Sequence, residues 1–554
     1  MTQLQTPDIA KLLKEYGLRT AMKGGNPYRA RAYSTAAENL ALLDRPLHEV
    51  IEAGQLTQIP GIGEAIAGVI EKMHREGTHP ALEDMRREVP EGLLPLLEIP
   101  RMRASDIAKI RAAGILDIAG LEHALKSGAL DNVKGFTAAF RRKLLEGIEI
   151  RGQSQGRVHI HRAQATLERA AAQLRVKYPE ILEVIITGEF RRRCELVGEM
   201  SLLAVMKKET ALPVGGGIKI HGCRPETKGA ALLFATGSPK HLDELQGLAK
   251  KKKMSLTPGG LMRGKKRVAG ESEEEIYEAL GLQYIVPEMR EGRGEIAKAA
   301  AGELPKLVTV KDIRGIVHAH TTASDGGNTL LEMAEAVRKR GYQYFGVSDH
   351  SQTAHYAGGL VPDGIIAQHK EADRLNKKFG KSFRIFKGIE SDILPDGSLD
   401  YPVDILKKFD FVVASIHGQF KTAREAQTQR LINAVKNPYT TILGHMTGRQ
   451  LLRRHGYDID IDAILKACAE NGVAVEVNGN PWRLDLDWRW HERALELGCM
   501  ICINPDAHSI AEIDLVGWGV AMSRKGGVPK ERVLNCMSLA EFTAYLAKRK
   551  RGDA

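Results

Sequence analysis

Histidine and acidic side chains recur at defined positions in the carboxy-terminal part of the sequence. They are six histidines and three carboxylates: His318, His320, Asp325, His350, Glu390, His417, His445, Asp506 and His508. In "HAH" and "PDAH" two of them stand two positions apart, so that in a strand both side chains lie on one face. Imidazole nitrogens mixed with carboxylate oxygens suit zinc, manganese or iron ions. These residue types predict a metal cluster if the fold brings them together.

Apolar stretches of strand length carry these side chains at their ends. They are "IRGIVHAH", "YFGVSDHS", "RIFKGIES", "FVVASIHG", "TTILGHMTG", "VAVEVNGN" and "MICINPDAH", with helical stretches such as "TLLEMAEAVRKRGY" and "IDAILKACAENG" between them. Strands alternating with helices predict a parallel α/β barrel, in which the carboxyl ends of the strands meet at one rim. A single such histidine is more simply a core or surface residue. The ordered series at strand ends favours one shared site.

Metal ions held by such a cluster could catalyse the hydrolysis of a phosphoester. Ions about 4 Å apart can share a hydroxide, lower its pKa and direct it at phosphorus, while a neighbouring ion stabilises the leaving oxygen. No protein nucleophile is required. The stretch "GHMTGRQLLRR" offers Arg449, Arg453 and Arg454 for phosphates, or these are ordinary helix charges. His417 and His445 are either ligands or include a proton donor.

The amino-terminal part has the pattern of a nucleic-acid-binding region. The chain has 554 residues and a formal charge of +11, which favours a polyanionic partner. Residues 1–150 have helical periodicity broken by glycine turns. In "IPGIG", Gly61 and Gly63 lead into a helix whose first N–H groups can approach a phosphate. This is the helix-hairpin-helix pattern of non-specific DNA binding, although a glycine-rich turn between packed helices needs no ligand.

The first 295 residues resemble the bacterial branch of the family X DNA polymerases. The motifs "NPYRARAYSTAAENL", "IPGIG", "GEFRRR", "GAALLFATGSPKH" and "PEMREGRGEI" follow one another in that family's order. The resemblance implies a nucleotidyltransferase-like palm and a thumb after the helical region. In the family's palm, three aspartates hold two magnesium ions around the incoming triphosphate. Their positions fall here at Glu199, Ser201 and His221.

The side chains at these three positions argue against ordinary nucleotide transfer. Two Mg²⁺ ions bring four positive charges and prefer oxygen ligands. Glu199 supplies one negative charge, Ser201 none, and His221 a nitrogen that magnesium does not favour. Glu199 is also a methylene longer than aspartate, and about 1 Å of misplacement can reduce a rate 100-fold. We therefore expect a degenerate palm that is a scaffold without polymerase activity and without bound magnesium.

A second activity of the family is expected to be lost as well. Amino-terminal domains of family X use a lysine just after the helix-hairpin-helix as a Schiff-base nucleophile that removes a sugar phosphate. Val69 stands at that position, and Lys72 is out of register by most of a helical turn. The resemblance therefore predicts that the lyase activity is absent while the parts that grip a duplex remain.

Residues 311–554 resemble the PHP (polymerase and histidinol phosphatase) family, whose distorted barrels hold a trinuclear metal site. All nine positions match that family's ligand pattern. The resemblance implies three ions with Glu390 bridging: the first on His318, His320, Glu390 and Asp506, the second on Asp325, His350 and His508, and the third on His417 and His445. We expect Glu390, His417, His445 and Asp506 to be catalytic. In bacterial fusions of the two families, the PHP part is a metal-dependent 3′–5′ exonuclease, often stimulated by manganese, and abasic-site cleavage is also known.

The sequence thus predicts a multidomain α and α/β protein with a distorted (β/α)7 barrel. The expected domains are a helical lyase-like domain (1–85), a helical fingers-like domain (86–150), a degenerate palm (151–225), a thumb (226–295), a linker (296–310) and the PHP domain (311–554).

The expected function is metal-dependent 3′–5′ exonuclease activity in DNA repair. We expect three Zn, Mn or Fe ions as cofactors, a monomer, and gapped or 3′-end duplex DNA bound largely independently of sequence. Two alternatives stay open: an active gap-filling family X polymerase with PHP proofreading, and a small-molecule phosphoesterase of the histidinol-phosphatase type. The basic amino-terminal domains disfavour the second, because a monoesterase has no use for a duplex clamp. The sequence has no signal peptide and no apolar run of about 18 residues, so a bacterial cytoplasm is expected.

Overall fold

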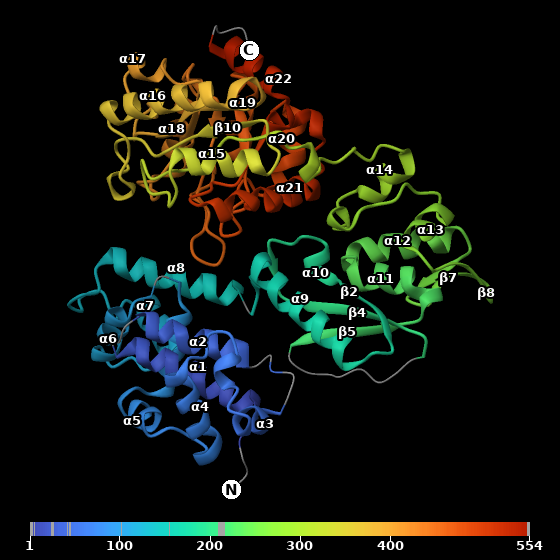
Figure 1. Ribbon diagram of the computed structural model, residues 1–554. Helices are drawn as coiled ribbons and strands as arrows, with labels where there is room; N and C mark the ends of the chain where they lie inside the picture. The colour runs from blue at the N-terminus through green and yellow to red at the C-terminus, as the bar shows by residue number, and fades with distance from the viewer. Residues whose placement is uncertain are drawn as a thin grey trace. The chain divides into compact units, whose positions relative to one another are not determined.

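The protein forms two compact units in a computed structural model that describes residues 4, 6–23, 27–40, 43, 46–100, 102–154, 156–208 and 217–550 (Figure 1). The first unit comprises Met1–Gly156 with Leu452–Arg454, and the second comprises Arg157–Leu451 with His455–Ala554. In the described part of the chain, no helix is long and apolar enough to cross a membrane.

The first unit is built from helices around two small cores, as its periodicity predicts. Its helices are α1 (Thr6–Met22), α2 (Pro27–Leu40), α3 (Leu47–Glu52), α4 (Glu64–Glu76), α5 (Pro80–Glu88), α6 (Ala104–Ala112), α7 (Ile118–Lys126) and α8 (Ala138–Ser154), with 3-10 turns at Leu56–Gln58 and Glu91–Glu98. In α4 the buried Ile66, Ile70 and Met73 recur at the spacing of one helix face. They pack into the first core with Leu13 and Leu40.

The second unit begins with the palm. Strand β4 (Met200–Met206) pairs antiparallel with β2 (Ile181–Ile186) and parallel with β5 (Ile218–Cys223). Helix α9 (Ile160–Lys177) packs on this sheet, β1 (Val158–His159) pairs with β3 (Leu196–Val197), and the turn between β2 and β3 holds α10 (Gly188–Arg191). The predicted strands "EVIITG", "MSLLAVM" and "GGIKIHGCRP" are therefore confirmed.

The thumb follows with four helices and a small antiparallel sheet. The helices are α11 (Lys228–Thr236), α12 (Pro239–Lys251), α13 (Glu273–Ala279) and α14 (Glu295–Ala301), and the sheet consists of β6 (Ser255–Thr257), β7 (Gly260–Arg263) and β8 (Lys266–Ala269). Ala230, Leu256, Ile276 and Tyr277 are among the residues of its separate core.

All seven predicted barrel strands form, and they pair in parallel in chain order. They are β9 (Gly315–Ile316), β10 (Tyr344–Val347), β11 (Arg384–Asp392), β12 (Phe411–Ser415), β13 (Ile442–Leu443), β14 (Ala474–Asn478) and β15 (Ile501–Asn504). The first and last strands meet just beyond their carboxyl ends, where Ala319 and Ala507 form a parallel bridge and His320 N–H donates to the Ala507 carbonyl over 2.8 Å. This closure brings "HAH" beside "PDAH".

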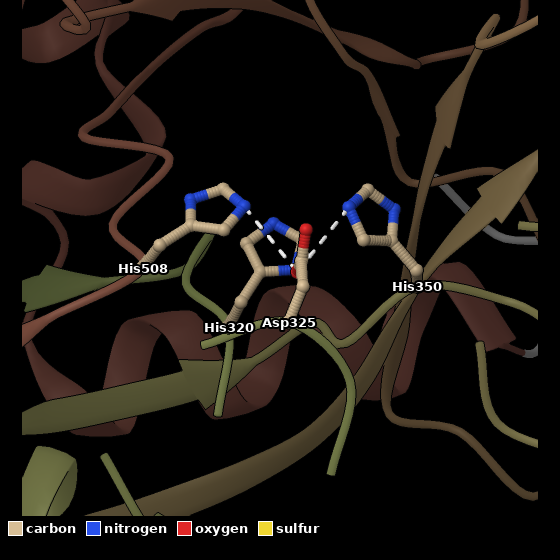
Figure 2. A group of neighbouring side chains, drawn as sticks. All are labelled: His320, Asp325, His350 and His508. Atoms are coloured by element: carbon tan, nitrogen blue, oxygen red, sulfur yellow. Dashed lines mark ion pairs between the residues drawn. The ribbon is translucent and has the colours of Figure 1, made fainter. Parts of the chain in front are cut away.

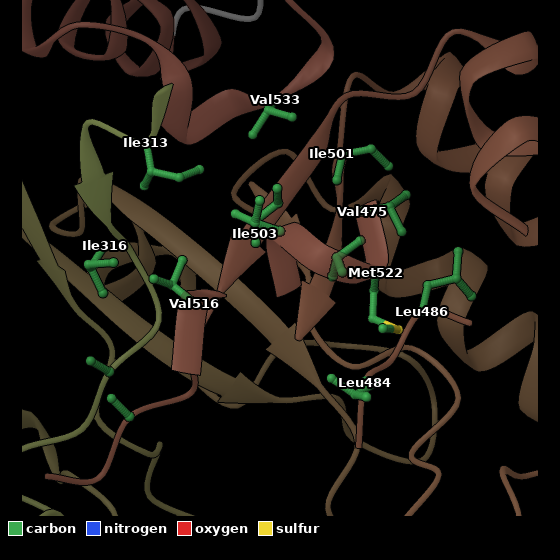
Figure 3. Close-up of a cluster of buried hydrophobic side chains, with 14 of the residues drawn as sticks. Ile313, Ile316, Val475, Leu484, Leu486, Ile501, Ile503, Val516, Met522 and Val533 are labelled. Atoms are coloured by element: carbon green, nitrogen blue, oxygen red, sulfur yellow. The ribbon is translucent and has the colours of Figure 1, made fainter. Parts of the chain in front are cut away.

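Helices cover the outside of the barrel. They are α15 (Leu330–Lys339), α16 (Pro362–Phe379), α17 (Val403–Leu406), α18 (Arg424–Lys436), α19 (Ile461–Glu470), α20 (His491–Leu497), α21 (Val516–Lys525) and α22 (Leu539–Lys550). Thr329 and Glu332 form a capping box that starts α15. Figure 3 shows Val516 and Met522 of α21 among the apolar side chains of β9, β14 and β15. The strands are buried on both faces, as a parallel barrel requires.

Candidate metal centre

Glu390 lies at the middle of the rim formed by the strand ends. It lies near the carboxyl end of strand β11, and its side chain is buried. Four histidines from four other strand ends surround its two carboxylate oxygens. The nearest nitrogen lies 3.4 Å away for His318, 2.9 Å for His350, 3.3 Å for His417 and 3.0 Å for His445. The carboxylate therefore lies where it can bridge ions held by different strands.

Asp325 forms a second focus at the outer part of the rim (Figure 2). Its Oδ1 lies 3.9 Å from His320 Nδ1, 3.7 Å from His350 Nε2 and 3.5 Å from His508 Nε2. Its side chain is 37% exposed, whereas the neighbouring histidines His320 and His350 are buried. Figure 2 shows the imidazoles of His350 and His508 turned toward this carboxylate from opposite sides. This part of the centre is the one exposed to solvent.

The nine predicted ligands are thus gathered at one rim, and eight of them form three overlapping groups. The groups are His318 with His320 and Asp506; His320 with Asp325, His350 and His508; and His350 with Glu390 and His417. His320 and His350 each belong to two groups, which differs from the separate sets that the resemblance implies. His445 contacts Glu390 from outside these groups. The assignment of each residue to one ion stays a prediction.

The buried carboxylates of the centre carry negative charge that favours the binding of cations. Burial disfavours the imidazolium of His318, yet the carboxylates of Glu476 and Asp506 raise its pKa well above the usual value. Burial also lowers the pKa of His417, but the carboxylates of Glu390 and Asp392 outweigh this effect and raise that pKa to about 10. The surplus of buried carboxylate charge must be balanced by protons or by metal ions. Divalent ions would replace the protons on these histidines.

Uncompensated lone pairs support the same conclusion. Among the described residues, buried polar atoms without a hydrogen bond include His318 Nε2, His320 Nδ1, His350 Nδ1, His445 Nδ1 and both oxygens of Glu390. Buried polar atoms without partners are costly and rare in folded proteins. Their concentration around one carboxylate is typical of a ligand set, so these residues fit divalent metal ions.

Two carboxylates behind the ligands were not singled out from the sequence. Glu476 of β14 accepts a hydrogen bond from His318 Nδ1 at 2.5 Å, and Asp392 of β11 accepts one from His417 Nδ1. Such partners fix the ring so that Nε2 is left for a metal. Asp392 stands two positions after Glu390, on the same strand face, and this spacing could have revealed it.

A third buried carboxylate holds the loop that carries Asp325. Asp349 accepts hydrogen bonds from Thr321 N and Oγ1, both at 2.7 Å, and from Ser324 Oγ and Gln368 Nε2. The loop also needs a glycine, since a Cβ on Gly326 would lie 2.6 Å from the His320 carbonyl carbon. Asp349 therefore has a structural role beside its neighbour His350.

Arg449 does not have the phosphate-binding role considered for it. Its Nε donates to the Arg483 carbonyl over 3.0 Å, and its other nitrogens bind Asp487 and the Leu484 carbonyl. Each guanidinium nitrogen donates one of these hydrogen bonds, which together hold the loop after β14. Roles for Arg453 and Arg454 stay predictions.

The chain has recognisable relatives over its whole length. Three family models match: the helix-hairpin-helix domain at 5–79, the DNA polymerase beta thumb at 231–291 and the PHP domain at 317–480. The chain is 33% identical over 582 aligned residues to the DNA polymerase/3′-5′ exonuclease PolX of Bacillus subtilis (strain 168), covering 99% of each chain. This chain belongs to the bacterial family X DNA polymerases with a PHP domain. The family resemblance and the fold class predicted from sequence are confirmed, whereas the domain boundaries stay predictions.

The PHP part has further relatives of its own. It is 31% identical over 248 residues to a probable phosphatase of Caldanaerobacter subterraneus subsp. tengcongensis, and 30% identical over 245 residues to one of Thermoanaerobacter sp. (strain X514). These alignments cover 42% of this chain and 91% and 94% of the two relatives, respectively. A PHP domain can therefore form a protein by itself, and in this family X member it is joined to polymerase-type domains.

The three palm positions of this family X member do not form a metal site among the described residues. Glu199 is exposed and lies 3.6 Å from Lys219 Nζ. Ser201 is buried and its hydroxyl lies 2.8 Å from Thr187 Oγ1, while burial lowers the pKa of His221.

Two of the three arginines of the "GEFRRR" turn form ion pairs with other side chains. Arg191 binds Glu273 of the thumb through two hydrogen bonds of 2.8 and 2.7 Å. Arg192 donates to Glu291 and to the Thr236 carbonyl. Glu189 in the same turn accepts from the backbone N–H of Gly198 over 2.6 Å. The turn therefore combines a carboxylate with two arginines that already have acidic partners.

The helix-hairpin-helix turn has the geometry that its glycines predict. Gly61 has a φ of 77°, and Gly63 is the residue before the first turn of α4. Side chains rarely adopt a positive φ, so the turn favours glycine at position 61. Val69 is buried on α4, and Lys72 is half-buried. The role of Gly61 and Gly63 in DNA binding stays a prediction.

Proposed function

We propose that this chain is a metal-dependent 3′–5′ exonuclease that acts on DNA through its PHP domain, and that its polymerase and lyase activities are lost. The observation that carries the proposal is the gathering of six imidazoles and three carboxylates at one barrel rim, with buried lone pairs that have no other partner. Phosphodiester hydrolysis is the reaction that such a centre suits best.

The roles of the residues follow from their positions. Bound divalent ions would supply Lewis-acid chemistry for attack on phosphorus. Glu390 would bridge ions, Asp325 and His508 would hold the ion nearest to solvent, and Glu476 and Asp392 would orient His318 and His417. The partly exposed Asp325 marks the side from which a strand end would reach the centre. The helix-hairpin-helix and the thumb would bind gapped or 3′-end duplex DNA, largely independently of sequence, in a monomer.

The loss of polymerase activity is supported by the palm. Its three metal positions hold one exposed glutamate, a buried serine and a histidine of lowered pKa, and Arg191 and Arg192 of its "GEFRRR" turn are paired. The loss of lyase activity is supported by the buried Val69 at the nucleophile position.

The test is shortening of a 3′-labelled gapped duplex in the presence of Mn²⁺. We expect the double variant His318→Ala/His320→Ala to lose shortening by at least about 100-fold, since both nitrogens face the ions. His455→Ala, which changes an exposed histidine, is the control. Shortening that survives the double substitution, or primer extension on added nucleotides, would contradict the proposal.

A second candidate is favoured by the likeness of the PHP part to probable phosphatases. A histidinol-phosphate-type monoesterase would use the same centre. Hydrolysis of a small phosphomonoester at a higher kcat/KM than DNA would support it over the exonuclease.

A further inference from the structure

One loop of the barrel contacts both the palm and the metal centre. Residues 480–489 follow β14, and within this loop Trp482 and Trp488 contact the palm while Arg483 points to the ligand Asp506. All of these residues belong to the second unit. The loop is therefore a physical link between two domains whose roles have so far been separate.

The first palm contact lies at Trp482. Its ring is 4.2 Å from the ring of His159, and the Arg162 guanidinium lies 5.0 Å from its centre. The Trp482 carbonyl accepts a hydrogen bond from Leu451 N, and the Leu451 carbonyl in turn lies 3.0 Å from His159 Nε2. The residue next to Arg483 is thus held by the start of helix α9.

The second palm contact lies at Trp488 and Arg489. Both donate to the buried Glu195, from Trp488 Nε1 over 3.1 Å and from Arg489 over 2.8 Å. The carbonyl of Glu195 accepts from Ile160 N, so the two contacts join at the same palm segment. The Lys525 ammonium lies 4.5 Å from the Trp488 ring centre. A carboxylate shared by two donors in a buried place is a specific contact, because charge-assisted hydrogen bonds are strong and directional.

Arg483 lies between these two anchors. Its Nε is 3.5 Å from Asp506 Oδ2, and among the described residues its guanidinium makes no hydrogen bond. The side chain is 18% exposed. The loop backbone beside it is strained, since the buried Leu484 has a φ of 46°. Arg449 binds the carbonyls on both sides of that strain. Surrounding contacts must maintain such a conformation, and it is often found at functional sites.

We propose that the palm tunes the metal centre itself: by holding loop 480–489, it places the Arg483 guanidinium to bind a non-bridging oxygen of the scissile phosphodiester. The inference rests on the proposed hydrolase function. A guanidinium suits a phosphate because it donates two parallel hydrogen bonds. Its distance from the ions must be correct to within about 1 Å for full effect. The degenerate polymerase core would then be a part of the nuclease site, beyond any role in gripping DNA.

The test uses a substrate too small to touch the palm. The full-length chain, loaded with Mn²⁺, is assayed on bis(p-nitrophenyl) phosphate and on a 3′-labelled gapped duplex. We expect Arg483→Gln to lower kcat/KM on both by about 100-fold and Arg483→Lys by less. We expect Glu195→Gln and Trp488→Phe, which change only the palm contact, to lower both by about 10-fold. The double variant Arg483→Gln/Glu195→Gln should be no worse than Arg483→Gln alone, because both changes act through one residue.

Controls separate this inference from other effects. Glu183→Gln removes a palm carboxylate that pairs with Lys228 at 2.8 Å, and should leave both rates unchanged. Bound metal per chain, measured by mass spectrometry, should stay at the wild-type level in Glu195→Gln and Trp488→Phe. Wild-type hydrolysis of the small diester by these two variants would overturn the inference alone. A wild-type chain without metal-dependent diesterase activity would overturn the proposed function together with it.

Discussion

At the scale of single residues, the chemistry depends on groups behind the ligands as well as on the ligands. Glu476 shows this clearly, because all four of its partners are donors. Oε1 accepts from His318 Nδ1 and Asn504 Nδ2, and Oε2 accepts from His445 N at 2.7 Å and Asn478 Nδ2. A glutamine there would place an amide NH₂ against two of these donors.

Substitution of Glu476 should therefore weaken metal binding. We expect Glu476→Gln to lower the affinity for the ion on His318 by about 10- to 100-fold, because the imidazole loses its orienting acceptor. Equilibrium dialysis against Mn²⁺ with metal analysis measures this effect without an activity assay. Glu335→Gln, which changes an exposed carboxylate paired with Lys378, is the matched control. Unchanged metal content in Glu476→Gln would show that the carboxylate does not contribute to metal binding.

At the scale of secondary-structure elements, a single buried carboxylate joins the palm to the thumb. Glu273 of α13 is 3% exposed and binds two arginines. One is Arg191 of α10, and the other is Arg290, which follows the 3-10 turn Pro287–Met289. Burial opposes the ionisation of Glu273, yet Arg191 and Arg290 lower its pKa from 4.5 to about 2. Since the pKa is lower in the folded state, the stabilisation is present above pH 4.5 and is lost as the pH falls toward 2.

The ion pairs of Glu273 with Arg191 and Arg290 make the stability of the thumb sensitive to acid. We expect Glu273→Gln to destabilise it by about 3–5 kcal/mol at neutral pH, because two guanidinium groups lose their partner. The variant should also lose the fall in stability between pH 4.5 and 2 that this carboxylate causes in the wild type. Hydrogen–deuterium exchange of α13 across that pH range measures both effects. Glu274→Gln on the same helix turn should behave as the wild type does.

The elements were predictable from sequence, and their side-chain partners only in part. The barrel strands can be recognised in the sequence as apolar runs that end in a histidine or an acidic residue. The closure of the barrel between Ala319 and Ala507 follows from the fold class. Arg483 gives no such signal, because its direction depends on a loop held by Arg449, Asp487 and the palm. Contacts between residues far apart in the chain have no period that a sequence can show.

At the scale of the whole molecule, affinity for DNA and reactivity at the rim have different physical origins. The chain carries a formal charge of +11, and the β7–β8 hairpin presents the exposed Lys265 and Lys266. Contacts of lysine with phosphate release counterions, so each one adds about 0.9 to the dependence of log affinity on log salt. The metal centre, in contrast, is buried and is screened much less by salt.

Removal of the hairpin charges should separate these two properties. We expect Lys265→Ala/Lys266→Ala to reduce the slope of log Kd against log NaCl on a gapped duplex by up to about 1.8, because two phosphate contacts are lost. Fluorescence anisotropy measures the slope, and hydrolysis of bis(p-nitrophenyl) phosphate by the same variant should equal that of the wild type. Lys370→Ala/Lys377→Ala on the barrel helix α16 removes as much charge and should leave the slope unchanged.

An equal loss of slope in both double variants would mean that net charge, and not the thumb hairpin, determines the affinity for DNA. The thumb would then have no specific part in presenting a strand end to the rim.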